Sequence, residues 1–552
     1  MVKQDTFSRL LRKRPQITPW TLVTMALVLV FLAPIFAVFV AASGDSGGLW
    51  AHLFTTVLPR YTANTLTLMF GVGVVSLVFG VSSAWMITRY EFPGRRVFEW
   101  LLLLPAAVPT YLIAYTYTDF LEYAGPVQQM LRELMGWKSA RDYWFPEIRS
   151  MYGAMLVLGA VLYPYVYMMT RTSFLLTPSA LFEVGQLAKR NVFFKVALPL
   201  SRPAIVAGLS LVLMETISEF GAVEYFAIET ITLGIFNVWL GMNSLPAAAQ
   251  IASISFLFII ALLSLELLAR SKRRFHNTSK KSKGLLPVKA SLGRAIGCIT
   301  VCLIPVVVGF VVPVGVLLTF VLKGYSIDFE DTVITASMNS ITLAGSVAIF
   351  IVTSAAFMGI VSNYQGGTFL KRMTALASIG YAFPGTILAI GVITVGGAVD
   401  NTIANFLENT FGISYQGWLT GSVGLVAIAC TIRFQAVGYG AVNSGMERMP
   451  RYMMDASRVL GRTFMQSIAK VIMPLLKTSL LTGGLLVFVD VMKELPMTLL
   501  LRPFNYETLA TFVYQYAKDE LLEEAALPAL FIVLMGIIPV MVMNATLRRM
   551  SK

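Results

Sequence analysis

Two pairs of acidic residues stand at matching positions in the two halves of the chain. Glu215 and Glu219 lie in or near an apolar segment, and Asp490 and Glu494 follow 275 positions later. Ionisable side chains in such segments are costly, so they usually face a cavity or a partner. A pathway lined with carboxylates would suit a hard cation, which prefers oxygen ligands. The pattern favours the alternative of internal pairing or gating, and it predicts no firm metal site. The same segments also hold Glu224 and Lys493.

Other chemistry has little support in the sequence. The chain has only two histidines, and its three cysteines lie inside apolar runs without metal-type or redox spacing. It also lacks a Gly-x-x-x-x-Gly-Lys-Ser/Thr phosphate loop, so it cannot bind and hydrolyse ATP by that route. We therefore expect no catalytic residues and no bound cofactor. A membrane enzyme is the weakest hypothesis. The energy for any work must come from a partner or from an ion gradient.

The elements that carry these acids are predicted to be membrane-spanning helices. Hydrophobic residues make up 57% of the 552 residues and charged residues only 13%, whereas a soluble domain has about 25% charged residues. The sequence thus predicts an all-α polytopic membrane protein with about 12 spans of about 20 residues each. The predicted spans are 20–42, 64–88, 97–119, 151–172, 203–227, 247–270, 295–322, 337–362, 371–398, 420–445, 478–501 and 526–547.

The net charge of +14 is concentrated in short segments between the apolar runs. This distribution is explained by the excess of Lys and Arg in cytoplasmic loops, and nucleic acid is not an expected partner. Loops that carry residues such as Arg89, Arg95 and Arg171 are predicted to be cytoplasmic. The basic segment 1–19 precedes a run long enough to span, so we expect an anchored first helix and no cleaved signal peptide. Both termini are predicted to lie in the cytoplasm.

The two halves of the sequence repeat at a fixed distance. The segments that begin at Asn64, Pro109 and Leu198 each have a counterpart 275 positions later, like the acidic pairs. We predict a first half at 1–270, a basic cytoplasmic linker at 271–294 and a second half at 295–552. An even number of spans in each half makes the two six-helix repeats parallel, with a pathway between them.

A polar, basic, amphipathic loop interrupts each half, at 176–202 and at 450–477. In the second loop, Asp455 suits the start of a short helix, Gly461 permits a sharp break, and Pro474 precedes the next span. We therefore expect two short helices on the membrane surface. Taken alone, this pattern equally fits an ordinary interfacial amphipathic helix.

The second loop resembles the signature loop of permeases in binding-protein-dependent ABC importers. Asp455, Ala456, Gly461 and Pro474 fit that family's spacing, with Ser457 as the small residue after the alanine. The resemblance implies a type I importer permease whose loops dock on two copies of a separate ATPase subunit, which uses the ATP. It also implies an extracytoplasmic solute-binding protein as a partner and a bacterial inner membrane as the location.

The first loop departs from the family pattern. Leu198 and Pro199 fit, but the constant offset of 275 places the acid position on Ala180 and the glycine position on Gln186. Alternatively, Glu183 is the family acid, the loop is three residues shorter, and Gly185 does not replace the missing glycine. Both registers stay open, and the resemblance implies that both loops contact the ATPase.

Further stretches resemble the ferric-iron importer permeases. They include Glu219-Phe220-Gly221 in the first half and Lys493-Glu494-Leu495-Pro496 in the second. The resemblance implies that the chain translocates ferric iron by alternating access. Thiamine, a polyamine or another small solute is the alternative cargo. A second class of function is a secondary transporter driven by an ion gradient, with the acids as its relay, but such a carrier needs no paired docking loops.

Overall fold

The computed structural model describes residues 18–188, 191–271, 287–324, 331–414, 417–447, 449–450 and 452–551. Nearly all regular structure in these ranges is helical, which confirms an all-α polytopic membrane protein. Ten of the described helices are long and apolar enough to cross a membrane, or eleven if one bent pair counts as a span. The 12 spans predicted from the sequence are therefore not all found as separate long helices.

The chain divides into two compact units that do not coincide with the sequence halves. The smaller unit combines the first described helix with residues 338–506, and the larger unit combines residues 42–337 with 507–552. The division into 1–270, 271–294 and 295–552 stays a prediction about the repeat. The packing unit of each helix is a separate matter, and each unit is described by itself below.

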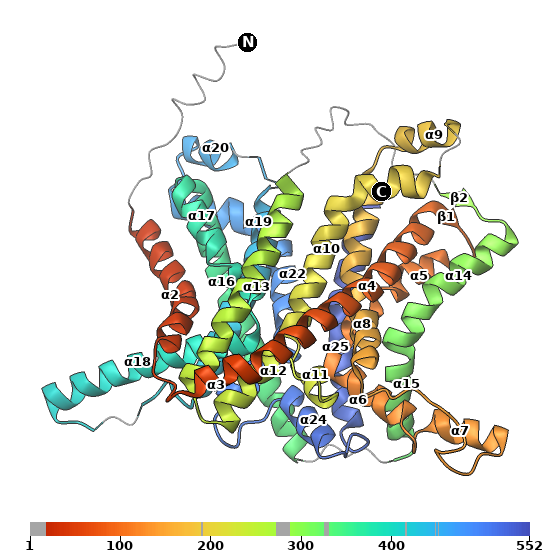
Figure 1. Cartoon of the computed structure of the whole chain (residues 1–552). Coiled ribbons are helices and arrows are strands. Elements are labelled where there is room, and N and C mark those ends of the chain that lie inside the picture. The colour runs from red at the N-terminus through yellow and green to blue at the C-terminus, as the bar shows by residue number, and fades with distance from the viewer. Residues whose placement is uncertain are drawn as a thin grey trace. The chain divides into compact units, whose positions relative to one another are not determined.

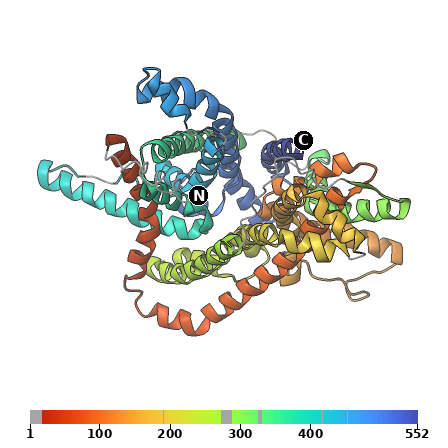
Figure 2. The same ribbon diagram turned by 90° about the horizontal axis from the view of Figure 1, so that it is seen from above.

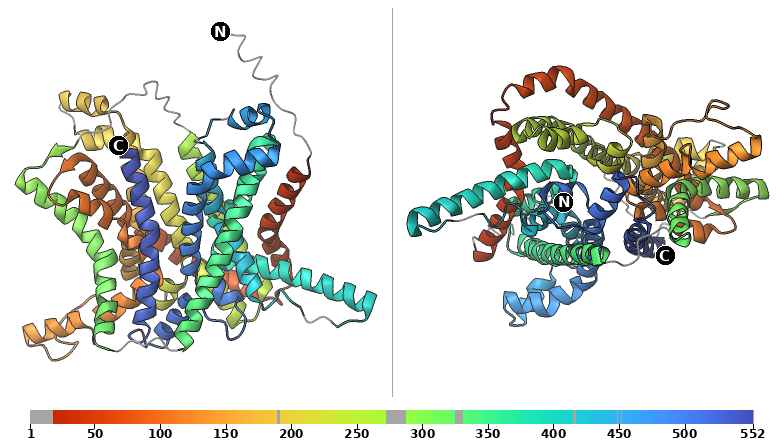
Figure 3. Two further views of the ribbon diagram at one scale, coloured as in Figure 1. Left: turned by 180° about the vertical axis from the view of Figure 1, so that it is seen from behind. Right: turned by 90° about the horizontal axis from the view of Figure 1, so that it is seen from below.

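In the larger unit, α4 (Leu58–Arg89), α8 (Met151–Leu176) and α10 (Leu198–Ser218) pack side by side (Figure 1). The close approach requires glycine, because a Cβ at Gly208 would lie 2.9 Å from the Cα of Val166. The other helices are α3 (Leu49–Thr56), α5 (Arg95–Leu101), η1 (Leu104–Ala107), α6 (Thr110–Leu121), α7 (Pro126–Met135), α9 (Ser179–Leu187), η2 (Phe193–Ala197), α11 (Gly221–Tyr225), α12 (Ile231–Phe236), η3 (Asn237–Gly241), α13 (Leu245–Ser271), α14 (Leu292–Val306), η4 (Val307–Val311), α15 (Val312–Leu322), α24 (Leu509–Lys518) and α25 (Ala526–Ser551). Of these, α15 and α25 lie side by side (Figure 3).

In the smaller unit, α2 (Pro19–Ala42) crosses α18 (Gly385–Phe411) (Figure 2). A Cβ at Gly391 of α18 would lie 2.0 Å from the carbonyl oxygen of Pro34, so only glycine allows this crossing. The other helices are α16 (Asp331–Tyr364), α17 (Thr368–Leu376), η5 (Ile379–Ala382), α19 (Val423–Glu447), α20 (Met453–Val459), α21 (Phe464–Ser467), η6 (Ile468–Ile472), α22 (Met473–Met492) and α23 (Pro496–Leu501).

The offset of 275 residues recurs in the local backbone structure. The π-helices η2 and η6 begin 275 residues apart, and so do the 3-10 helices η1 and η5. The long helices α10 and α22 begin at the same interval. The sequence repeat therefore extends to unusual backbone features. The orientation of the two repeats relative to each other stays a prediction.

Several predicted spans have different bounds in the structure. The third, at 97–119, is broken at Val108 and Pro109, where the flanking helices bend by 94°. Val108 has an extended backbone, as expected for a residue before proline. The ninth, at 371–398, is interrupted before α18 in the same way. The fifth and eleventh end earlier than expected, because α10 and α22 stop just before Glu219 and Glu494.

The end of the predicted linker pairs with the loop after α4. Strand β1 (Tyr90–Glu91) and strand β2 (Val288–Lys289) are parallel, and the N–H of Ala290 donates to the carbonyl oxygen of Glu91 at 3.0 Å. Residues 272–286, which hold most of the basic residues of the linker, lie outside the described residues. The linker thus joins the larger unit directly after its basic run.

Candidate functional site

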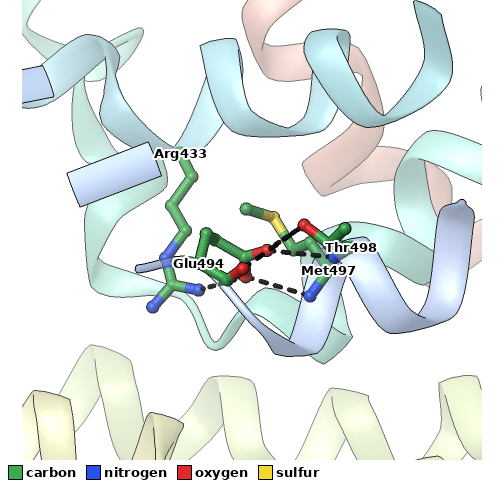
Figure 4. Close-up of polar contacts among 4 residues, drawn as sticks. All are labelled: Arg433, Glu494, Met497 and Thr498. Atoms are coloured by element: carbon green, nitrogen blue, oxygen red, sulfur yellow. Dashed lines mark hydrogen bonds and ion pairs between the residues drawn. The ribbon is translucent and has the colours of Figure 1, made fainter. Parts of the chain in front are cut away.

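Glu494 caps a short helix through its buried carboxylate. It lies between α22 and α23 and is only 5% exposed. Its Oε1 accepts the N–H of Met497 at 2.9 Å, and its Oε2 accepts the N–H of Thr498 at 3.0 Å (Figure 4). The Thr498 hydroxyl also donates to Oε2, at 2.9 Å. These bonds satisfy N–H groups at the start of α23, where a negative charge also suits the helix dipole.

Arg433 of α19 supplies the counter-charge. Its Nη1 lies 3.4 Å from Oε1 of Glu494, and both side chains are largely buried (Figure 4). The arginine fits because position 385 is glycine: a Cβ there would lie 2.6 Å from Nη1. Two buried charges are tolerated only when they are paired and hydrogen-bonded. Arg433 therefore allows an ionised carboxylate to cap α23 inside an apolar unit.

Glu219 occupies the corresponding place in the larger unit. It follows α10 and precedes α11, and its Oε1 accepts the N–H of Ala222 at 3.0 Å. Its Oε2 accepts the hydroxyl of Thr110 at 2.6 Å. Thr110 is 275 residues before Gly385. The two acids thus share the bond to the third residue onward, but a hydroxyl in one unit and a guanidinium in the other complete the site.

The other two predicted pathway acids lie one helical turn earlier. Glu215 is half-buried on α10 and Asp490 is half-buried on α22. Over the described part of the chain, no group of three or more His, Cys, Asp and Glu side chains could hold a metal ion. The structure brings Glu219 and Glu494 each to a helix start, which favours a structural role. A pathway lined by the four acids stays a prediction.

The second predicted coupling loop is a short helix followed by a glycine break. α20 ends at Val459, and Gly461 has a left-handed φ of 83°. The N–H of Gly461 donates to the carbonyl oxygen of Arg458 at 3.0 Å, and the N–H of Arg462 donates to that of Ser457 at 3.3 Å. This pair of bonds is a Schellman motif, whose left-handed position favours glycine. Gly461 therefore ends the helix and turns the chain.

Buried side chains hold this loop to the smaller unit. Met454 packs with Val442, Met446 and Ile472, and the hydroxyl groups of Ser457 and Ser467 are hydrogen-bonded at 2.9 Å. A capping box at Thr463 begins α21. The predicted docking residues lie on the outside of this scaffold: Asp455, Ala456, Gly461 and Pro474 are all exposed.

The first predicted coupling loop is built differently. α9 is anchored by Phe182, which is 1% exposed and packs on Trp85 with ring centroids 6.5 Å apart. Gly185 is buried, and a Cβ there would lie 2.8 Å from the Cγ2 of Val196. Its role is close packing of α9 on η2 and not a turn. Of the other predicted residues, Glu183 is exposed, and Leu198 and Pro199 are half-buried at the start of α10.

Both loops present apolar side chains at the surface. An exposed group of this kind on a polar loop marks a site for a partner surface. In the first loop the exposed residues are Leu181, Val184, Leu187 and Phe194, and in the second they are Tyr452, Val459, Leu460 and Met465.

Sequence reasoning missed the partners of the buried charges. Arg171 was expected in a cytoplasmic loop, but it lies in α8, is 2% exposed, and its Nη2 is 3.2 Å from Oε2 of Glu99. That expectation was wrong because α8 extends beyond the apolar run and buries its last turns. Arg433 and Thr110 were also missed. For Arg433 the signal was present, since an arginine inside an apolar span requires a partner.

Comparison with known proteins identifies the type of protein. Residues 76–274 match the family of binding-protein-dependent transport system inner membrane components. The chain is 22% identical to the Fe(3+)-transport system permease protein FbpB 2 of Haemophilus influenzae, over 89% of this chain and 91% of that protein. It is 29% identical to the sulfate transport system permease protein CysT of Salmonella typhimurium, over 41% of this chain. It is 28% identical to the molybdenum transport system permease protein ModB of Escherichia coli, over 36% of this chain.

These matches agree with the membrane helices, the repeat and the paired loops. Residues 76–274 belong to the family of binding-protein-dependent transport system inner membrane components, and the chain is a permease subunit of an ABC importer, similar over most of its length to a ferric-iron permease.

Proposed function

We propose that this permease translocates ferric iron delivered by an extracytoplasmic binding protein. The observation that carries the proposal is the similarity to an Fe(3+)-transport permease over 89% of this chain and 91% of that protein. A second similarity, to a putative ferric transport permease of the same organism, covers 80% of the chain. Both matches extend across the two halves, so they concern the fused permease as a whole.

Transport is driven by two copies of a separate ATPase, which bind the loops at 176–202 and 450–477. The exposed apolar residues on α9 and beside α20 support this proposal, because a partner protein would remove them from water. Asp455 and Glu183 are exposed on the same short helices and would lie at the rim of the contacts. The arrangement places both loops and both termini in the cytoplasm of a bacterium and the permease in its inner membrane.

An oxyanion is the second candidate cargo. The sulfate and molybdenum permeases have higher identity to this chain, at 29% and 28%, but they cover only 41% and 36% of it. The shared segment contains the helix-and-loop scaffold common to these permeases. The more extensive match therefore favours iron.

Uptake by reconstituted vesicles tests both parts of the proposal. The permease is purified with its ATPase, and the binding protein is added outside with ferric iron, sulfate or molybdate. We expect ATP-dependent uptake of iron alone. Uptake of an oxyanion without iron would overturn the cargo, and uptake without ATPase but sensitive to an uncoupler would overturn the importer mechanism.

A further inference from the structure

A third acid differs from the two helix caps. Glu224 of α11 is partly exposed, with 21% of its side chain open to solvent. The hydroxyl of Tyr514 donates to its Oε2, and Nζ of Lys518 lies 3.2 Å from its Oε1. Both partners belong to α24. Glu219 and Glu494 bind N–H groups of the backbone, whereas the bonds to Glu224 come from side chains that can move.

The Lys518 contact is the weaker of the two. Lys518 is 55% exposed, and an exposed ion pair contributes little because water competes for both charges. Its ammonium group is also a cation held beside a carboxylate by a flexible stem. Another cation can therefore take its place at low cost, while the lysine side chain moves into water.

Oxygen atoms predominate around this carboxylate. The buried Tyr115 has Tyr514, Glu224 and Tyr225 as electrostatic neighbours, and its ring centroid is 4.5 Å from that of Tyr225. Carboxylate and phenol oxygens are hard ligands, which suit a hard, highly charged cation and not a soft one. The composition of the cluster thus selects for a class of ligand.

The wider surroundings are acidic. Glu122 and Glu520 act on Tyr225, and Glu122 and Glu523 act on Asp119. The opposing cations are Arg149, Lys323 and Lys518. An excess of carboxylates around a partly open site raises the local concentration of cations.

We propose that Glu224 and Tyr514 form a transient receiving site for a hard trivalent cation, whose place Lys518 holds when no cargo is present. The proposal rests on the proposed function and names the residues that first accept the cargo. On binding, the cation coordinates the Glu224 carboxylate and the ammonium group of Lys518 moves to solvent. Where Tyr514 coordinates as phenolate, its proton is released to water, so no oxidant or reductant is needed.

The site has no counterpart in the second half. The residue 275 positions after Glu224 is Leu499, and the residue 275 positions before Tyr514 is Trp239. A purely structural contact that joins α11 to α24 is the competing explanation. It makes Lys518 a stabilising partner, whereas the proposal makes it a competitor of the cargo.

Spectroscopic titration separates the two explanations. Purified permease is titrated with ferric nitrilotriacetate, and the phenolate-to-iron charge-transfer band is followed. We expect Lys518→Met to lower the apparent dissociation constant roughly fivefold, the scale of an exposed ion pair. Tyr514→Phe should remove the band, and Glu224→Gln should weaken binding more than about tenfold, as loss of a charged ligand requires. Lys138→Met, which removes a charge from an exposed loop, is the control and should match the unmodified protein.

The proposal is overturned if the band persists in Tyr514→Phe or if Lys518→Met leaves the affinity unchanged or weaker. Size-exclusion profiles identify variants that do not fold, and Lys518→Arg should then retain the original affinity. Iron uptake by the unmodified complex is measured separately. Uptake without the spectroscopic changes refutes the receiving site and leaves the proposed function intact, whereas absence of uptake refutes the function regardless of the titration.

Discussion

The two helix starts after α10 and α22 show how one local solution can be completed in two ways. In both, an acid accepts the N–H of the third residue onward. The larger unit completes Glu219 with the hydroxyl of Thr110, and the smaller unit completes Glu494 with the guanidinium of Arg433. The shared element is the acid as a cap, and the variable element is its second partner. This comparison explains why the acids recur at a fixed offset without a metal having to bind them.

The two loops differ in the same manner. α20 ends at Val459 ahead of Gly461, whereas α9 continues to Leu187, three residues beyond the position that corresponds to Val459. The corresponding position 186 is not glycine, so the helix is not broken there. A buried aromatic residue, Phe182, anchors the longer helix, and Met454 anchors the shorter one. We expect the following substitutions to affect the two halves unequally.

The largest effect is expected from Arg433→Met. It leaves the Glu494 carboxylate buried without its counter-charge, which costs about 3–5 kcal/mol. The measurement is the free energy of unfolding in mixed micelles. Leu158→Met, at the corresponding position of the first half, is the control and should cost less than about 1.5 kcal/mol. Adding Glu494→Gln to Arg433→Met should recover part of the loss, and a double variant less stable than the single one would contradict the pairing.

Phe182→Ala is next, with an expected loss of about 3 kcal/mol in the docking of α9. The aromatic side chain is buried against Trp85, so its removal should release the helix. Hydrogen exchange of the α9 amides measures the release. The control, Phe194→Ala, removes a ring that is 60% exposed and should leave exchange unchanged. Equal exchange in both variants would show that Phe182 is not the anchor.

Thr110→Val removes the hydroxyl that donates to Glu219 and leaves that carboxylate oxygen short of a donor. The expected loss of unfolding free energy is about 2 kcal/mol, smaller than for Arg433→Met because no charge is unpaired. Thr402→Val, which removes an exposed hydroxyl from α18, should have an effect within about 0.5 kcal/mol. If Thr110→Val were as damaging as Arg433→Met, the two caps would not differ as described.

Gly461→Ala should have the smallest effect on stability, about 1 kcal/mol, because a Cβ disfavours the left-handed backbone. Space is not the cause, since nothing lies within 4 Å of the added atom. Gly440→Ala in α19 has equal space and a helical backbone, so it should be neutral or slightly stabilising. Coupling is read from ATP hydrolysis stimulated by the binding protein, which should fall for Gly461→Ala and not for Gly440→Ala.

Much of this architecture was predictable from the sequence, and the rest depended on contacts between distant segments. Apolar runs predict the helices, the offset of 275 predicts matching elements, and Gly461 predicts a helix end from its own conformational freedom. The pairing of Glu494 with Arg433 was not predictable in the same way. It joins residues 61 positions apart and depends on the absence of a side chain at Gly385. The break at Pro109 was readable locally, but a hydropathy pattern conceals it.

The exchange of helices between sequence halves determines what a divided gene could produce. The smaller unit contains α2 from the first half, and the larger unit contains α14, α15, α24 and α25 from the second. A fragment ending before residue 272 would therefore lack four helices of one unit and have one helix without its unit. Two fragments synthesised together could still assemble, because every helix would be present, whereas either fragment alone could not complete a unit. Joining the halves in one polypeptide guarantees their equal supply.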